Sequence, residues 1–555
     1  MKSYLTPFLI NALAELCKPL GAEAPQEITL EIPRNIEHGD LSTNVAMMLA
    51  KGLKKNPREI ATTLVALLKS RIDTEIVTDI SIAGAGFINF TFAKDFYGKR
   101  LRDVFTQGED YGKSTRGKGI KANVEYVSAN PTGLLHVGHG RNAAIGDTLA
   151  NILLWNGYDV TREYYFNNAG NQMNNLGRSV HLRYLQQLDS SVEFSQEDKG
   201  LYHGEYIKDI AKTLVGKHHD TLKEPTEDNL AICRKAGEEW CFATIRATME
   251  RMNIHHDVYF NEDSLYSDGK VKDTIERLRE KGVVYEKDGA TWLALSKMGM
   301  NDDRVIIKSS GEPTYRLPDI AYHHDKLSRR KFDLVVDIFG ADHIATIPDV
   351  MAAVETLGED KSKVRVVIHQ FVTLMKDGEQ VKMSKRTGRS YTLDDLMEEF
   401  GADVTRFFFI MRGVSTHLEF DLNLAEEQSE KNPVFYLQYA HARIASIMRT
   451  AEERGVSVAN HADTALLLHP SEIDLIKLIL RFPETLSRAA ETLEPQGIAE
   501  FLRDVAAAFH KFYHDCRILG EAEELMQARF ALLKAAKTVL KNGLTVLGIT
   551  APEKM

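Results

Sequence analysis

The spacing of apolar and polar positions predicts a mixed domain over residues 1–110. Residues 27–33 and 79–92 have the character of strands. Between them, residues 51–70 place apolar side chains at helical spacing behind a turn at Asn56-Pro57. The pattern therefore predicts an N-terminal α+β domain.

A second pattern begins after residues 111–120, which are rich in Gly, Ser and Lys and are predicted to be a linker. A strand at 121–128 leads through a Gly-rich turn into a helix closed by Gly157, and a second strand follows at 160–166. This order is typical of a doubly wound, Rossmann-like parallel sheet. Further core strands are expected at 304–308, 333–340 and 363–372. Together these elements predict an α/β catalytic domain over residues 121–400.

The remaining segments are predicted to be helical. Residues 170–300 are charged and lack strand alternation, which indicates a helical insertion in the α/β domain. Residues 401–430 are expected to form a connecting helical segment, and residues 431–555 an all-α bundle of about four amphipathic helices. The N-terminal residues 1–20 resemble an amphipathic helix rather than a signal peptide. No apolar run reaches the roughly 18 residues that span a membrane, so no membrane partner is expected.

Charge and cysteine content refine this organisation. The formal charge is −10, of which residues 111–430 carry −9, while the two ends are near neutral. An acidic protein has no global field that gathers nucleic acid, so any RNA-binding surface would need local basic and aromatic patches. The scattered cysteines form no CxxC pair and argue against a disulfide framework or a structural zinc site; a reducing cytoplasm is the expected location. They are Cys17, Cys233, Cys241 and Cys516.

The stretch from Asn130 to His139 is the first candidate for chemistry. His136 and His139 flank Gly138 where a strand passes into a helix N-terminus, a place that favours bound anions. A metal pair is disfavoured, because no Glu or third His has the spacing of a zinc motif. On its own the pattern is weak, and two histidines in a turn can be incidental.

The second candidate is Lys382-Met383-Ser384-Lys385, which follows the last predicted strand. It lies in residues 381–390, a Gly- and Ser-containing segment with four cations and no acidic residue. A cationic loop can be a solvated face or a phosphate clamp. HxGH after the first strand combined with KMSK after the last strand resembles the paired signature of class I aminoacyl-tRNA synthetases.

The surrounding residues narrow the resemblance to the arginyl-tRNA synthetases. Residues 38–51 look like the extra N-terminal domain of that family, and the C-terminal LGITAPEKM is also similar. The other matching stretches are 125–133, 167–170, 315–321, 340–343 and 432–444. One position departs from the family pattern, because Asn168 stands where the family usually has Asp. The resemblance covers almost the whole chain.

The resemblance implies that ATP, accompanied by Mg²⁺, is held by two groups of residues. His136 and His139 would contact the phosphates, with Gly138 allowing close approach to the backbone. Lys382, Met383, Ser384 and Lys385 would close over the departing pyrophosphate. Asp342 and His343 would face the adenosine ribose, although Asp342 can also be interpreted as a helix N-cap.

It also implies an L-arginine site built on carboxylates. A guanidinium is a planar cation with five donors, so a pair of carboxylates suits it. Glu125 and Asp319 are the expected pair, and Tyr315, one helical turn before Asp319, would add its hydroxyl. Ser128 and Asn130 would hold the α-ammonium and carboxylate. Apart from the resemblance, the pattern favours surface charges at both positions, Glu125 at a strand edge and Asp319 on a helix.

Residues of the C-terminal helices are expected to bind tRNA(Arg). Tyr436, Tyr439 and Arg443 share one helix face, and aromatic and Arg planes can stack on splayed bases. The resemblance adds Tyr513 and Met555. The alternative is that the aromatic stripe is core; Gln438 and His441 nearby favour a polar surface.

Taken together, these features predict a cytoplasmic, monomeric ligase that activates arginine with ATP and transfers it to the 2′-OH of the terminal adenosine of its tRNA. Three alternatives stay open. Another class I synthetase, such as the cysteinyl enzyme, would want zinc-ligating residues near its pocket. A non-catalytic tRNA-binding relative would not need both histidines and both lysines. A small-molecule nucleotidylyltransferase would need neither end domain.

Overall fold

The computed structural model describes the whole chain except residues 1, 26–27, 32, 34, 195–199, 382–390 and 458–461. The chain forms two compact units. The first comprises residues 1–108, 446–480 and 507–538, and the second comprises residues 109–445, 481–506 and 539–555. Each C-terminal helix contributes to both units.

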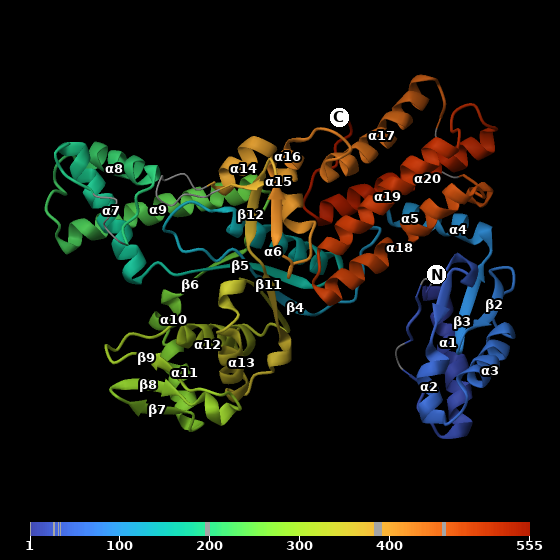
Figure 1. Ribbon diagram of the computed structural model, residues 1–555, viewed down its shortest axis with the longest axis horizontal. Coiled ribbons are helices and arrows are strands. Elements are labelled where there is room, and N and C mark those ends of the chain that lie inside the picture. The colour runs from blue at the N-terminus through green and yellow to red at the C-terminus, as the bar shows by residue number, and fades with distance from the viewer. Residues whose placement is uncertain are drawn as a thin grey trace. The chain divides into compact units, whose positions relative to one another are not determined.

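The first unit begins with the α+β domain that the pattern predicts (Figure 1). Its sheet has the order β1-β3-β2, and both pairs are antiparallel. The elements are α1 (Lys2–Cys17), β1 (Leu41–Thr43), α2 (Val45–Leu53), α3 (Pro57–Lys69), β2 (Val77–Ala83), β3 (Phe87–Phe92), α4 (Lys94–Arg100) and α5 (Arg102–Gln107). Helix α3 begins where expected, because the Asn56 side chain accepts from the N–H of Arg58 and Pro57 occupies the first turn.

Two strand predictions in this domain were inaccurate. Residues 79–92 form a hairpin of two strands, since Gly84 and Gly86 take positive φ and turn the chain. In the predicted strand 27–33, the described residues make only an isolated bridge, from Glu31 to Ser42.

The second unit contains a five-stranded parallel sheet of order β11-β10-β4-β5-β6. Its strands are β4 (Lys121–Glu125), β5 (Asp159–Phe166), β6 (Val258–Asn261), β10 (Leu334–Gly340) and β11 (Val364–His369). The chain extends the sheet from β4 through β5 to β6, then continues on the other side of β4 with β10 and β11. The order therefore reverses between β4 and β10, where open α/β sheets bind ligands.

The segments between the strands of this sheet are more than a helical insertion. Between β5 and β6 lie α7 (Gly170–Leu188), α8 (Glu205–His218) and α9 (Glu227–Arg251), which pack side by side on a core of their own (Figure 1). Between β6 and β10 lie α10 (Asp263–Ser267), α11 (Lys270–Glu280), β7 (Val284–Lys287), β8 (Ala290–Leu293), β9 (Arg304–Ile307) and α12 (Arg316–His324). Strands β7, β8 and β9 form a separate antiparallel sheet.

The prediction that residues 170–300 lack strands was therefore wrong, and so was the assignment of 304–308 to the core sheet. β6, β7 and β8 have four residues each, which is too short for a visible alternation. The third core strand is β6, and β9 belongs to the small sheet. An Asp288-Gly289 turn with positive φ at both residues joins β7 to β8, and this pair is a recognised hairpin signal.

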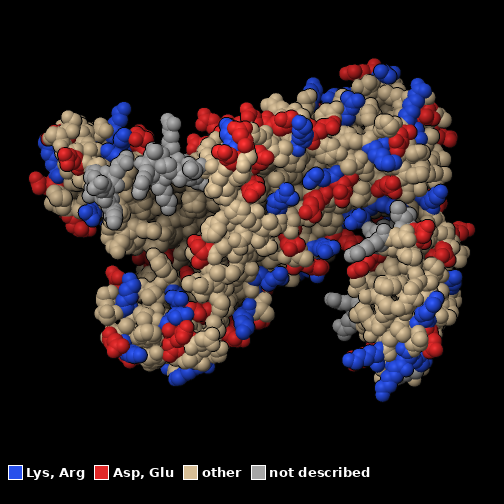
Figure 2. All heavy atoms as spheres, viewed as in Figure 1, with Lys and Arg blue, Asp and Glu red and all other residues tan. Residues whose placement is uncertain are grey.

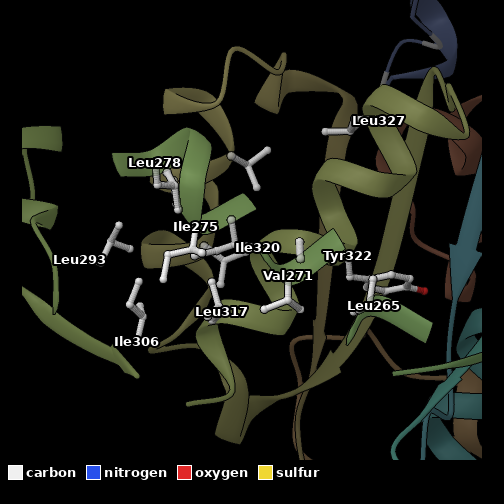
Figure 3. Packing of buried hydrophobic residues seen from close by; sticks show 14 of the residues in the cluster. Leu265, Val271, Ile275, Leu278, Leu293, Ile306, Leu317, Ile320, Tyr322 and Leu327 are labelled. Carbon is white, nitrogen blue, oxygen red and sulfur yellow. The ribbon is translucent and has the colours of Figure 1, made fainter. Parts of the chain in front are cut away.

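The core of this part holds α12 in a defined orientation (Figure 3). Leu317 and Ile320 of α12 pack against Val271, Ile275 and Leu278 of α11, and all are buried. Because these apolar residues face the cluster, the polar residue between them, Asp319, is left to face the opposite side of the helix.

The remaining elements of the second unit are the crossover helices of the sheet and the segment that leads to the C-terminal helices. The predicted strand 363–372 is divided between β11 and β12 (Val372–Lys376), which belong to different sheets. The segment 401–430 contains a strand, β14, that pairs in parallel with β12. The linking elements are β13 (Glu379–Gln380), α14 (Leu393–Phe400), α15 (Ala402–Ile410), β14 (Leu418–Asp421) and α16 (Leu422–Glu426). Two further helices connect strands within the sheet: α6 (Val137–Trp155) joins β4 to β5, and α13 (Ile347–Thr356) joins β10 to β11. The C-terminal helices are α17 (Pro433–Glu453), α18 (Pro470–Thr492), α19 (Gln496–Asp515) and α20 (Glu523–Val546). Among the described residues, no helix is long and apolar enough to cross a bilayer.

Candidate active site

A cavity of about 400 Å³ lies where the sheet order reverses. Its walls come from the C-terminal ends of β4 and β10 and from α12 and α13, and its size is that of a small-molecule site. The predicted residues that line it are Glu125, Ser128, Asn130, Tyr315, Asp319 and His343. Residues that are up to 218 positions apart in the chain are thus brought to one place.

Three carboxylates line this cavity. Burial raises the pKa of Asp319 to about 7, and it also raises the pKa values of Glu125 and Glu262. Glu262, which was not predicted from the sequence, follows β6 and accepts hydrogen bonds from the Tyr165 hydroxyl (2.7 Å) and the Asn167 amide (2.8 Å). An acidic residue at the end of a parallel strand would have been the signal, but β6 was not predicted. An acidic cavity of this kind suits a cationic ligand.

Glu125 already has internal partners. Lys326 Nζ lies 2.7 Å from Glu125 Oε2 and 2.8 Å from Asp337 Oδ1, and the Ser128 hydroxyl donates to Glu125 Oε1 at 3.0 Å. Lys326 and Asp337 are fully buried beneath the cavity. Of the ion pairs between described residues, none involves Asp319 or Glu262. The carboxylates that lack a Lys or Arg partner are therefore Asp319 and Glu262, not Glu125.

His323 adds a cation beneath Asp319. Its Nε2 lies 2.9 Å from a carboxylate oxygen of Asp337, and its Nδ1 lies 2.8 Å from the carbonyl oxygen of Asp319. Both ring nitrogens face acceptors, so both must donate, which requires the imidazolium form. Burial lowers the pKa of His323, but the Asp337 carboxylate outweighs this effect and the pKa is raised overall.

Tyr315 lies one helical turn before Asp319, as expected: its carbonyl accepts from the N–H of Asp319 at 3.3 Å, and both residues line the cavity. Tyr315 is the N-cap residue of α12, and its side chain is 77% exposed at the rim of the cavity. The residues before it form an extended segment rather than a helical turn, and Pro313 bridges to Ile307. The expected one-turn separation therefore places Tyr315 at the mouth and Asp319 in the wall.

His136 and His139 stack on each other at the start of α6, with ring centroids 3.7 Å apart. Nδ1 of His136 accepts from the N–H of Gly138 (3.1 Å), and Nδ1 of His139 accepts from the N–H of His136 (3.3 Å). A neutral imidazole that accepts at Nδ1 carries its proton on Nε2. Burial, followed by the nearby His136 and His369, lowers the pKa of His139 to about 3, so this ring is neutral. Both rings can therefore offer an Nε2–H donor at a helix N-terminus.

The other predicted ATP residues have different placements. Gly138 lies in the first turn of α6, where an added Cβ would be only 3.0 Å from His136 Cε1. His343 lines the cavity, stacked on Phe339 at 5.5 Å. Asp342, in the short 3-10 turn 341–343, is exposed, does not cap a helix, and is not part of the cavity wall.

The four residues Lys382, Met383, Ser384 and Lys385 lie outside the described part of the chain. The described residues on either side are anchored. Val381 donates to the carbonyl of Leu374 at 2.9 Å, and Thr392 bridges to His136. Thr392, just after these residues, therefore lies directly beside His136.

Comparisons with known proteins identify the family. Residues 100–407 match the model of class I tRNA synthetase (R) catalytic domains, and residues 7–92 match the model of arginyl tRNA synthetase N-terminal domains. Residues 437–555 match the DALR anticodon binding domain. An arginine–tRNA ligase from Salinibacter ruber is 52% identical over all of both chains, and one from Chlorobaculum parvum is 47% identical over the same share. The chain belongs to the arginine–tRNA ligase family.

Solved structures agree with this assignment. A protein from Campylobacter jejuni that is described as an arginyl-tRNA synthetase is 34% identical, with a TM-score of 0.77 over 84% of this chain and 100% of its own. The Thermus thermophilus arginyl-tRNA synthetase has the same fold, with a TM-score of 0.77 over 99% of both chains at 22% identity. As a member of the arginine–tRNA ligase family, the chain is a class I aminoacyl-tRNA synthetase that uses ATP and aminoacylates tRNA with arginine.

The residues expected to bind tRNA lie on the surfaces of the C-terminal helices. Tyr439 and Arg443 are exposed on α17, and Tyr436 is partly exposed. The core side of the same helix carries other, apolar residues, which are Val434, Leu437, Ala440 and Ile444. Tyr513 on α19 and the terminal Met555 are 37% and 55% exposed. The exposed positions argue against the alternative in which this stripe forms the core.

Gln438 and His441, in contrast, are buried, so they do not mark a polar surface. The Gln438 amide donates to the carbonyl of Thr550 at 3.0 Å, and His441 Nδ1 lies 2.8 Å from the carbonyl oxygen of Pro552. These polar residues hold the C-terminal tail against α17, which explains why they occur between apolar positions.

Asn168, the departure from the pattern expected for arginine–tRNA ligases, also has a structural partner. Its amide nitrogen donates to Glu238 Oε1 of α9 at 2.7 Å. An Asp at this position would place two carboxylates in contact. Asn at this position is therefore consistent with the carboxylate of Glu238 that faces it.

Proposed function

We propose that the cavity binds L-arginine with its guanidinium between Asp319 and Glu262. These carboxylates line the cavity without a Lys or Arg partner among the described residues, and this observation carries the proposal. Glu125, which Lys326 already neutralises, then faces the α-ammonium beside Ser128 and Asn130. Tyr315 at the mouth would add its hydroxyl. This arrangement shifts the expected guanidinium pair from Glu125 and Asp319 to Glu262 and Asp319.

The activation step follows from this placement. The arginine carboxylate attacks the α-phosphorus of ATP, the bond to the bridging oxygen breaks, and pyrophosphate leaves with the electron pair. The Nε2–H groups of His136 and His139 would donate to phosphate oxygens as charge shifts toward the leaving group. His343 would lie at the nucleoside, with Asp342 near the ribose. By family resemblance, Lys382 and Lys385, with Met383 and Ser384, would neutralise the departing pyrophosphate. Mg²⁺ would enter with ATP, since phosphate oxygens are its preferred ligands.

In the second step, the 2′-OH of the terminal adenosine of tRNA(Arg) attacks the arginyl carbonyl, and AMP leaves. We assign anticodon contact to the domain 431–555, through Tyr436, Tyr439, Arg443, Tyr513 and Met555. The domain 1–110 would contact the outer corner of the tRNA, with 111–120 as its linker to the catalytic domain 121–400. We expect the enzyme to act as a cytoplasmic monomer and to require bound tRNA for activation.

Pyrophosphate exchange with each amino acid, with and without tRNA, tests this function. Exchange that depends on arginine alone among the amino acids is the expected result. Exchange with a different amino acid, or none with arginine and tRNA present, would contradict it.

The guanidinium site is tested by Glu262→Gln. Because the neutral amide keeps its shape but loses the charge that faces the substrate, we expect the KM for arginine to rise at least about tenfold, as for the loss of one charged hydrogen bond of about 1.5–3 kcal/mol. Glu355→Gln is the matched control, since Glu355 is an exposed glutamate on α13 that pairs with Lys361 outside the cavity. An unchanged KM for arginine in Glu262→Gln would contradict this site and favour Glu125 as the partner of the guanidinium.

A further inference from the structure

Asn142 is a buried side chain of α6 that links three parts of the cavity wall. Its Oδ1 accepts from the backbone N–H of Val127 at 2.6 Å, and its Nδ2 donates to the carbonyl of Ile338 on β10 at 2.9 Å. The second Nδ2 proton points to His369 Nε2, 3.3 Å away at the end of β11. One amide therefore ties the end of β4 to β10 and β11.

The orientation of this amide is determined by its partners. Nδ1 of His369 lies 3.2 Å from the carbonyl oxygen of Gln370 and must donate to it, which leaves Nε2 as an acceptor. Burial lowers the pKa of His369, so the neutral ring that this bond requires is the stable form. If the Asn142 amide were flipped, its N–H₂ group would face the N–H of Val127 and its oxygen would face the carbonyl oxygen of Ile338, and neither pair can form a hydrogen bond. Asn142 thus has one arrangement that satisfies every neighbour.

The turn that Asn142 holds is strained. Val127 and Ser128 take φ values of 69° and 45°, a left-handed conformation that β-branched Val strongly disfavours. Such residues keep this conformation only when their surroundings fix it. Ser128 is fixed further by its hydroxyl, which donates to Glu125 and accepts from the N–H of Tyr165 at 3.1 Å. The turn carries Ser128 into the cavity and leads to Asn130.

Helix α6 joins this turn to the phosphate-binding end of the site. His136 and His139 lie at its start, and Asn142 lies one turn after His139. We propose that Asn142 is a positioning residue for arginine activation. It holds the Val127–Ser128 turn on the helix that carries both histidines, and so sets the distance between the arginine carboxylate and the α-phosphate. The inference rests on the proposed roles of Ser128 and the histidines.

The test compares Asn142→Ala, Val127→Gly and the double variant with wild type by arginine-dependent pyrophosphate exchange in the presence of tRNA. Without the hydrogen bond from the Val127 N–H to Asn142, the strained turn relaxes, and a displacement of about 1 Å can lower a rate about 100-fold. We expect Asn142→Ala to lower kcat about 10- to 100-fold and to change the KM for ATP less than about threefold. Gly adopts positive φ without strain, so Val127→Gly should restore at least about fivefold of the lost kcat in the double variant.

Asn156→Ala is the control for a merely structural effect. Asn156 is a fully buried residue at the end of the same helix, and it donates to the carbonyls of Ile152 and Leu486 away from the cavity. We expect this variant to lose thermal stability but to keep its kcat below the melting temperature. Arginine-dependent exchange by the wild-type enzyme tests the proposed function separately from the role of Asn142.

Two results would overturn the inference: a wild-type kcat in Asn142→Ala, or additive losses in the double variant. If Asn142→Ala does not fold, Asn142→Asp replaces it. This isosteric change keeps the acceptor for Val127 but removes the donor toward His369 and Ile338. Its kcat should rise as the pH is lowered from 8 to 6. A proton taken up by Asp at position 142 or by His369 restores a hydrogen-bond donor between these two side chains. A kcat in this variant equal to that of wild type across this range would also refute the proposal.

Discussion

At the residue scale, we expect Asp319 to make arginine binding depend on pH. Its carboxyl lies in the cavity wall, and burial raises its pKa to about 7. His323 lowers this pKa, whereas the nearby carboxylates of Glu125 and Glu262 raise it by smaller amounts. A bound guanidinium favours the ionised form and would lower this pKa again. Below pH 7 the empty site therefore holds a proton that arginine must displace.

We predict that the KM for arginine falls as the pH rises from 6 to 8. For a single group with a pKa of about 7, the protonated fraction weakens binding about tenfold at pH 6 and very little at pH 8. Exchange kinetics at several pH values measure the effect, with the KM for ATP as an internal control. Asp319→Asn should bind arginine weakly at every pH. A KM for wild type that is flat over this range would show that Asp319 is already ionised in the free enzyme.

The residues of the cavity could be predicted where a local motif carries them. Asp319 and Tyr315 share a short motif and both line the cavity, so both could be found from the sequence. His136 and His139 share another motif, at the start of α6, and could be found in the same way. Glu262 was missed because it ends a strand that the pattern did not reveal. The Lys326–Glu125 pair joins residues 201 positions apart and has no local signal, yet our proposed guanidinium site depends on it.

At the scale of elements, hydrogen bonds between side chains join helices that short sequence patterns treat separately. The start of α7 is linked to α9 through Asn168 and Glu238, and both helices also pack on a shared core that includes Leu176 and Cys233. Helix α3 could be predicted because its cap, its proline and its apolar spacing agree. The β7–β8 hairpin could not be predicted from periodicity, since each strand presents at most two residues to a face.

We predict that Asn168→Asp destabilises this link. The change replaces a charge-assisted hydrogen bond with two carboxylates in contact, and we expect the free energy of unfolding to fall by about 1–3 kcal/mol. Chemical denaturation measures the change. Adding Glu238→Gln should restore most of the loss, because the glutamine amide can donate to the carboxylate introduced at position 168. A double variant no more stable than Asn168→Asp would mean that Glu238 is not the determining partner.

At the scale of the whole molecule, the distribution of charge is more informative than its sum. The net charge of −10 argued weakly against an RNA partner, but a tRNA ligase needs only local basic surfaces. Acidic and basic side chains are interspersed over much of the face shown in Figure 2, and Lys and Arg gather at one end of the N-terminal domain, at the bottom of the view. The turn between α2 and α3, with the adjoining ends of both helices, exposes four cations in this domain, Lys51, Lys54, Lys55 and Arg58.

This cluster, residues 51–58, leads to a prediction about tRNA binding. Each phosphate contact releases condensed counterions, so the logarithm of the affinity falls with the logarithm of the salt concentration by about one unit of slope per contact. We expect Lys54→Ala, Lys55→Ala and Arg58→Ala combined to weaken tRNA binding and to reduce this slope by about two to three. Removal of Lys272 and Lys281, exposed on and after α11, is the control and should leave the slope unchanged. Equal slopes for wild type and the triple variant would place the tRNA elsewhere, and the basic turn would then be a solvated surface that offsets the acidic residues of the rest of this domain.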